Sequence, residues 1–195
     1  LRDVCSKYSP SDTTIKDKAD EIIRYLRYEK VENDAAERPD VLFMKGTIRR
    51  EEARAGARYS GIKSDDHIHF LDLPFYETGL VKKNDLSEAD IAIVKKLLTD
   101  VKPDEMFVAG DLADPHGTHR VCLNAVLAAI DEEKKAGAEW LKDCRIWMYR
   151  GAWAEWEIEN IEMCVPLSPE ELRAKRNSIL KHQSQMESAP FLGND

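Results

Sequence analysis

Hydrophobic residues return every three or four positions in several stretches of the chain, which is the spacing of an amphipathic helix. Ser11–Glu29 shows this pattern with Ser11 or Asp12 available as a cap, and Asp85–Asp100 repeats it with Ser87 as the cap. Ser168-Pro169, followed by two glutamates, is a strong helix start. Five helices are expected, over residues 11–29, 47–59, 85–100, 116–135 and from 168 towards 185.

Shorter apolar or alternating runs lie between these helices and predict β-strands. Met106–Ala109 is an apolar run that ends at Gly110, and His67–Leu73 alternates polar and apolar residues until Pro74. Arg145–Arg150 and Glu157–Val165 complete the set, the second with only approximate alternation. Strands that alternate with helices predict an α/β protein with a mainly parallel sheet flanked by helices.

Composition limits the range of functions. The chain has 195 residues with 43% hydrophobic content, enough for one globular domain over 1–195, with 189–195 as a tail. A net charge of -8 argues against nucleic acid as a partner. No apolar run approaches the roughly 18 to 20 residues that span a bilayer, and no secretion pattern is present. Four separated cysteines without a C-x-x-C motif fit a reduced, cytoplasmic setting.

The segment Gly110–Cys122 carries the candidate chemistry. A buried strand ends at Gly110, and His116 and His119 follow at the expected start of a helix. Side chains three apart on a helix are neighbours, so both rings could reach one point at the carboxyl end of the sheet, where a metal could bind. Two histidines do not complete a zinc site, and the alternative is a capped turn in which Asp114 is the helix cap.

Four stretches together resemble the LmbE-like or PIG-L-type de-N-acetylases, which are zinc hydrolases of N-acetylated amino sugars on a Rossmann-like fold. The likeness covers about residues 44–185. It is carried by Arg49-x-x-Glu52 with a following Ser-Gly-Ile, by the loop Phe75–Gly79, by His116-Gly-Thr-His119, and by His182-Gln-Ser-Gln185. Three segments resemble a subgroup that is fused C-terminal to a glucosamine-6-phosphate deaminase (isomerase) domain. Their sequences are KGTIRREEARAGARYSGI, FLDLPFYETG and GDLADPHGTHRVC. Nothing in this chain resembles that deaminase domain.

The resemblance implies roles for individual residues. It makes His119 a zinc ligand and His116 the catalytic group that stabilises the oxyanion. Arg49 is the candidate for binding sugar hydroxyls or a phosphate, and the alternative is a surface ion pair with a neighbouring glutamate. Glu77 is a second substrate-binding candidate. Asp111, Asp114 and His182 are expected to support the site, with capping or packing as their alternative roles.

Aromatic and further histidine side chains have weaker assignments. Trp153 and Trp156 could stack on a sugar ring or fill a core or a subunit interface. His67 and His69 share one face of the predicted strand and are interpreted as a feature of a sheet edge rather than as ligands.

One family motif is missing, because members begin with a strand and a His-Pro-Asp-Asp sequence that supplies two zinc ligands and the general base. Its absence indicates an amino-terminally truncated fragment whose sheet lacks its first strand and whose exposed edge favours self-association into a homo-oligomer. We expect such a fragment to bind zinc weakly and to be inactive, whereas the intact domain would hydrolyse the amide bond of an N-acetylated amino sugar. The expected partner is an amino-sugar or sugar-phosphate small molecule. The alternative is a complete, non-catalytic regulatory or oligomerisation module for a glucosamine-6-phosphate deaminase. A nucleotide-binding regulator is disfavoured because no G-x-G-x-x-G is present.

Overall fold

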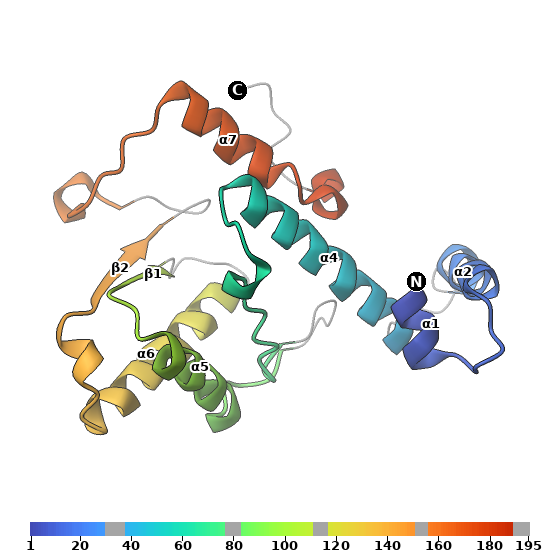
Figure 1. Ribbon diagram of the computed structural model, residues 1–195, viewed down its shortest axis with the longest axis horizontal. Helices are drawn as coiled ribbons and strands as arrows, with labels where there is room; N and C mark the ends of the chain where they lie inside the picture. Colours follow the sequence, from blue (N-terminus) through green and yellow to red (C-terminus); the bar gives the residue numbers. More distant parts are fainter. Residues whose placement is uncertain (30–37, 77–82, 111–116, 151–155, 189–195) are drawn as a thin grey trace. The chain divides into compact units, whose positions relative to one another are not determined.

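The computed structural model describes residues 1–29, 38–76, 83–110, 117–150 and 156–188 (Figure 1). Within these ranges the protein is α/β and helix-rich, with a two-stranded parallel sheet, as the alternation of helix and strand patterns predicts. The chain divides into two compact units. The first unit comprises Leu1–Phe70 and Leu167–Asp195, and the second comprises Leu71–Pro166.

The second unit is a β-α-β arrangement preceded by a helix. Helix α5 (Glu88–Val101) leads into β1 (Glu105–Ala109), α6 (Thr118–Lys135) connects the strands, and β2 (Arg145–Tyr149) pairs with β1 in parallel. The short 3-10 helices η3 (Glu139–Lys142) and η4 (Ile158–Asn160) flank β2 in sequence. The predicted strands at Met106–Ala109 and Arg145–Arg150 are confirmed within one residue, and the helix predicted over residues 85–100 is confirmed within three.

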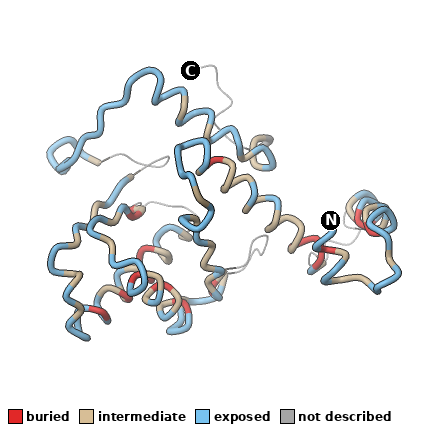
Figure 2. Tube along the Cα trace, in the orientation of Figure 1, coloured by how far each residue is buried: buried red, intermediate tan, exposed pale blue. Residues whose placement is uncertain are grey.

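The core of the second unit lies between α5 and α6. Val94 and Leu98 of α5 pack against Ala125 and Ala129 of α6, because side chains three or four apart lie on one helical face. Figure 2 shows the buried positions gathering along these two helices. Met106 packs onto this cluster from β1, so the helices cover one face of the sheet.

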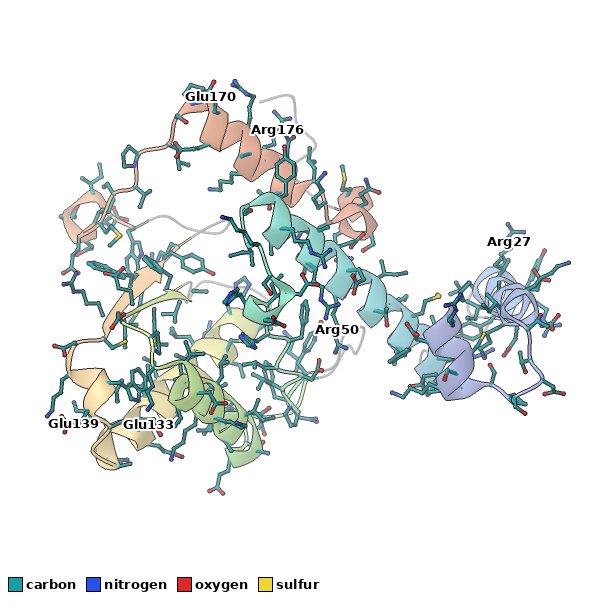
Figure 3. All side chains as sticks on the ribbon, in the orientation of Figure 1. Arg27, Arg50, Glu133, Glu139, Glu170 and Arg176 are labelled. Atoms are coloured by element: carbon teal, nitrogen blue, oxygen red, sulfur yellow. The ribbon has the colours of Figure 1, made fainter. Side chains whose placement is uncertain are left out.

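A buried carboxylate stabilises the far end of α6. Glu133, labelled in Figure 3, is buried and accepts a hydrogen bond of 3.2 Å from the indole nitrogen of Trp140. A buried polar group is costly unless it is hydrogen-bonded, so this contact ties η3 to the helix that precedes it.

The first unit consists of helices. Helix α1 (Arg2–Tyr8) is followed by α2 (Ile15–Arg24), which continues as the π-helical turn η1 (Tyr25–Glu29). Helix α4 (Pro39–Tyr59) is the longest, and η2 (Asp65–His67), α7 (Pro169–Ile179) and η5 (Gln183–Ser188) follow. Val4, Ile22, Tyr25 and Val41 form the core shared by α1, α2 with its π turn, and the start of α4.

Capping residues explain where several helices begin. Ser87 and Ser168 form capping boxes with the acidic residue three positions later, as their sequences predict. The cap of α2 was predicted at Ser11 or Asp12, and this is wrong. Thr14 is the cap, and its hydroxyl accepts a 3.1 Å hydrogen bond from the amide of Asp17. The carboxylate of Asp17 in turn accepts a hydrogen bond from the amide of Thr14, which completes a capping box. Neither Ser11 nor Asp12 has an acidic residue three positions later.

Two of the predicted strands are absent from the described residues. His67–Leu73 contributes the end of η2 and then an irregular segment, so His67 and His69 do not share a strand face, and both are exposed. Glu157–Val165 contributes η4 and then residues without regular structure. Alternation specifies a chain with one apolar side, whereas a strand also needs a neighbour that accepts its backbone hydrogen bonds.

Candidate functional site

The first candidate region is the carboxyl end of the sheet in the second unit. Gly110, directly after β1, donates a 2.8 Å hydrogen bond from its amide to the carbonyl of Tyr149 at the end of β2. An added Cβ at Gly110 would lie 2.8 Å from the Cβ of Met148, so only glycine allows this approach. The two strand ends are therefore held together at the edge where parallel sheets place ligands.

His119 occupies the first turn of the helix that follows this edge. Helix α6 begins at Thr118, and Gly117 precedes it with φ 69°, in the left-handed region that favours glycine. The helix was expected to begin at about His116, but it begins at Thr118. Of the histidine pair, only His119 therefore lies within the helix as the structure describes it. The side chain of His119 is exposed. His116, Glu77, Asp111 and Asp114 lie outside the described residues.

Trp156 lies against the same strand ends. Its indole nitrogen donates a 2.9 Å hydrogen bond to the carbonyl of Met148, and the guanidinium of Arg150 stacks over its ring at 3.9 Å. One ring face is thus covered by a cation, in a cation–π contact. Trp153, the other candidate for stacking on a sugar, lies outside the described residues.

The donor chemistry of the described residues does not by itself make a zinc site. In the part of the chain that the structure describes, no group of three or more His, Cys, Asp or Glu side chains converges on a point that could hold a metal. A catalytic zinc needs three protein ligands, and His119 supplies one nitrogen donor.

A separate candidate region lies in the first unit, along one face of α4. The carboxylate of Glu52 accepts hydrogen bonds from the amide and the hydroxyl of Ser184, at 2.7 and 2.6 Å. The structure thus joins the Arg49-x-x-Glu52 motif to the His182-x-Ser184-Gln185 motif, across more than a hundred residues of sequence.

Small residues allow this close approach of α7 to α4. An added Cβ at Gly56 would lie 3.2 Å from the carbonyl of Ser178 and 3.3 Å from Nε2 of His182. The Ser178 hydroxyl donates a 2.9 Å hydrogen bond to the Gly56 carbonyl and accepts one of 2.9 Å from the hydroxyl of Ser60. His182 therefore lies against α4 beside Gly56.

Arg49 lies one helical turn before Glu52 on α4 and is half-buried. The two glutamates that could have paired with it have other partners. Glu51 forms an ion pair with Arg54, and Glu52 binds Ser184. Among the described residues, no hydrogen bond or ion pair joins Arg49 to either glutamate.

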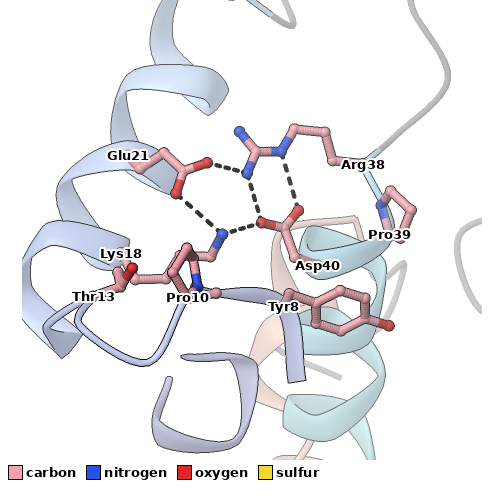
Figure 4. Close-up of a pocket in the computed structure, with 9 residues that line it drawn as sticks. Tyr8, Pro10, Thr13, Lys18, Glu21, Arg38, Pro39 and Asp40 are labelled. Atoms are coloured by element: carbon pink, nitrogen blue, oxygen red, sulfur yellow. Dashed lines mark hydrogen bonds and ion pairs between the residues drawn. The ribbon is translucent and has the colours of Figure 1, made fainter. Parts of the chain in front are cut away.

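A charged pocket near the amino end of α4 is a feature that the sequence analysis missed. It has a volume of about 360 Å³ and lies between α1, α2 and the start of α4 (Figure 4). Lys18 contacts Asp40 at 2.7 Å and Glu21 at 3.1 Å, and Arg38 pairs with the same two carboxylates. The spacings Lys18-x-x-Glu21 and Arg38-Pro-Asp40 were the available signals.

Buried charge pairing sets the pKa values in this pocket. Burial alone would raise the pKa of Asp40, but hydrogen bonds from Arg38 and Lys18 and their positive charges outweigh it and lower that pKa to about 2. For Lys18, burial acts to lower the pKa, and the two carboxylates more than compensate and raise it. All four groups are therefore charged at neutral pH and satisfy one another.

The chain is similar to a protein of Bacteroides thetaiotaomicron that is named "Putative glucosamine-6-phosphate deaminase-like protein". The two sequences are 68% identical over 184 residues, which make up 94% of this chain and 27% of the relative. The chain thus spans about a quarter of the length of the curated relative that it matches. No protein-family model and no solved structure matches the chain. None of the helices in the described ranges combines the length and apolar character needed to cross a membrane.

Proposed function

We propose that this chain is a portion of a longer amino-sugar-metabolising protein, and that the intact domain is a zinc-dependent hydrolase of N-acetylated amino sugars. The observation that carries the first half of this proposal is the 68% identity with a much longer protein whose name contains glucosamine-6-phosphate deaminase. The second half rests on the motif resemblance, and on the contact between Glu52 and Ser184, which joins two of those motifs in space.

Each candidate residue has a defined role in this proposal. His119 is a zinc ligand, and His116 offsets the charge that develops on the amide oxygen. Arg49 binds sugar hydroxyls or a phosphate through paired hydrogen bonds, for which a guanidinium is suited. Its two neighbouring glutamates are engaged elsewhere, which supports this role.

Four further residues complete the assignment. Glu77 accepts hydrogen bonds from the sugar, and Asp111 and Asp114 orient the histidines. His182 positions α7 against Gly56. The remaining zinc donors come from outside the described residues, and the localisation we propose is the cytoplasm.

A non-catalytic regulatory or oligomerisation module is the second candidate function. The observation that favours it is apolar surface on the sheet of the second unit, where Phe107 and Tyr149 are exposed. Exposed apolar patches mark surfaces that bind another protein or another part of the chain.

The test uses a chimera, in which this chain replaces the matched residues of the Bacteroides relative. Zinc-loaded chimera is given N-acetylglucosamine 6-phosphate and glucosamine 6-phosphate separately, and acetate and ammonium are measured. Acetate release that falls at least about a hundredfold in His119→Ala, and is retained in the exposed control His67→Ala, supports the hydrolase. Ammonium release alone, unchanged by His119→Ala, supports the module. Acetate release that is unaffected by His119→Ala would refute the assignment of that residue.

A further inference from the structure

Among the described residues of the second unit, the α5 and α6 cluster packs against one face of the sheet. Met106 faces the core between α5 and α6, so its neighbour Phe107 points to the opposite face, where it is 57% exposed. Phe107 pairs in register with Trp147, and Tyr149 is two residues further along the same face. We call these three residues the aromatic face. Parallel sheets occur almost entirely with both faces covered, so the exposure of Phe107 and Tyr149 on this face points to an incomplete unit.

Trp147 provides a second sign of incompleteness. Its indole nitrogen is buried, yet it has no hydrogen-bond partner among the described residues. Buried indole N–H groups normally find an acceptor, because leaving one unpaired costs free energy. An additional backbone segment beside the aromatic face would bring carbonyl acceptors.

The segment Ile161–Val165, which we call the unpaired strand, follows in the same unit and has the pattern of a strand without a neighbour. Its alternate residues Ile161, Met163 and Val165 are apolar and are 41%, 39% and 70% exposed. Ile161 has extended backbone angles, with φ -84° and ψ 115°. Among the described residues, the backbone of Glu162–Pro166 forms no hydrogen bond.

A connecting segment that served only to bridge distance would be expected to be polar, as linkers are. The unpaired strand instead has one apolar side, and Glu162 lies on the other. This is the pattern of a half-buried strand, whose apolar side packs on a core and whose backbone pairs with another strand. Its features are thus those of a binding surface for a β-strand.

We propose that a β-strand from another part of the same longer polypeptide pairs with the unpaired strand and thereby completes the second unit. The source of this strand is indicated by the relative, because 27% of that protein matches this chain and the remainder supplies ample additional sequence. The interaction is strand addition, in which backbone hydrogen bonds give affinity and the alternate apolar side chains give specificity. The proposal does not depend on the reaction that the longer protein catalyses.

Hydrogen exchange of the peptide that contains the unpaired strand tests this proposal. It is measured in this chain alone, in the chimera, and at the equivalent residues of the unmodified relative, which needs no engineering. We expect exchange to be at least about tenfold slower in the chimera and in the relative than in this chain alone. Equal exchange rates in all three proteins would overturn the proposal.

A matched pair of variants identifies the surface that is bound. In the chimera, Met163→Lys on the apolar side should restore fast exchange, whereas Glu162→Lys on the polar side should keep the protection. Far-UV circular dichroism checks that both variants fold. Light scattering of this chain alone, at tens of micromolar, tests whether a second copy of the chain binds the unpaired strand instead. A dimer in which the peptide is already protected would show that a second copy pairs with the strand, and would refute our proposal.

Discussion

The buried charges around Asp40 allow a direct test of how this fold depends on pH. The carboxylate of Asp40 lies between Lys18 and Arg38, and its side chain is almost fully buried. Replacement of Asp40 by Asn keeps the shape and removes the charge. The buried cation of Lys18 then retains Glu21 alone as a carboxylate partner among the described residues.

The expected loss follows from the pKa. Asp40 titrates at about 2 in the folded protein and at about 3.8 when unperturbed, and at 1.36 kcal/mol per pKa unit this shift is worth about 2 kcal/mol. The folded-state pKa is the lower one, so the contribution is present above pH 4 and is lost as the pH falls through 2. Breaking one partner of a buried pair adds to the cost, so we expect Asp40→Asn to destabilise the first unit by about 2–4 kcal/mol at pH 6.

The assay is hydrogen exchange of peptides from α2, compared between wild type and variant at the same pH, so that intrinsic exchange rates cancel. Glu21 is present in both proteins, so its own effect on stability cancels in the comparison. Tryptophan emission is an internal control, because all four tryptophans lie in the second unit. Glu170→Gln is the matched control, because it removes a carboxylate from an exposed pair with Arg173, in the same unit, that is worth little.

Two outcomes would refute this reasoning. The first is an equal loss of stability in Asp40→Asn and Glu170→Gln. The second is a difference between wild type and Asp40→Asn that stays constant from pH 6 down to pH 2, since protonation of Asp40 should remove most of it.

Further predictions concern close packing and the candidate site. Gly110→Ala should destabilise the second unit by about 1–3 kcal/mol in urea unfolding followed by tryptophan emission, because the new methyl group has no room. Gly46→Ala, in the open interior of α4, should instead stabilise the first unit by about 0.5–1 kcal/mol, measured by exchange of α4. Glu52→Gln should speed exchange at the amide of Ser184 severalfold, while Glu51→Gln leaves it unchanged. Calorimetric titration of this chain alone should show only weak zinc binding, and stoichiometric binding at micromolar concentration would contradict the expectation of an incomplete ligand set.

Part of the candidate site could be predicted from local sequence. The strand end at Gly110, the helix with His119 in its first turn and the serine caps of α5 and α7 follow from short-range patterns. Their causes lie within a few residues of one another, as in a capping box or an apolar run before a glycine. The contact between Glu52 and Ser184 has no such signal, because it depends on how two helices distant in sequence pack together.

The amino-acid sequence by itself determined that the chain is α/β, where α5 and α6 lie, where α7 begins, and which segments have an apolar side. Tertiary structure alone decided whether an alternating segment became a strand, because a strand needs a partner for its backbone. It also decided that Lys18, Glu21, Arg38 and Asp40 neutralise one another. The buried charges of Lys18 and Asp40 are tolerated because each is reached by an opposite charge from a distant part of the sequence. Local sequence preferences determine where helices form. The pairing of strands and of buried charges depends on contacts between distant segments, so only the tertiary structure determines it.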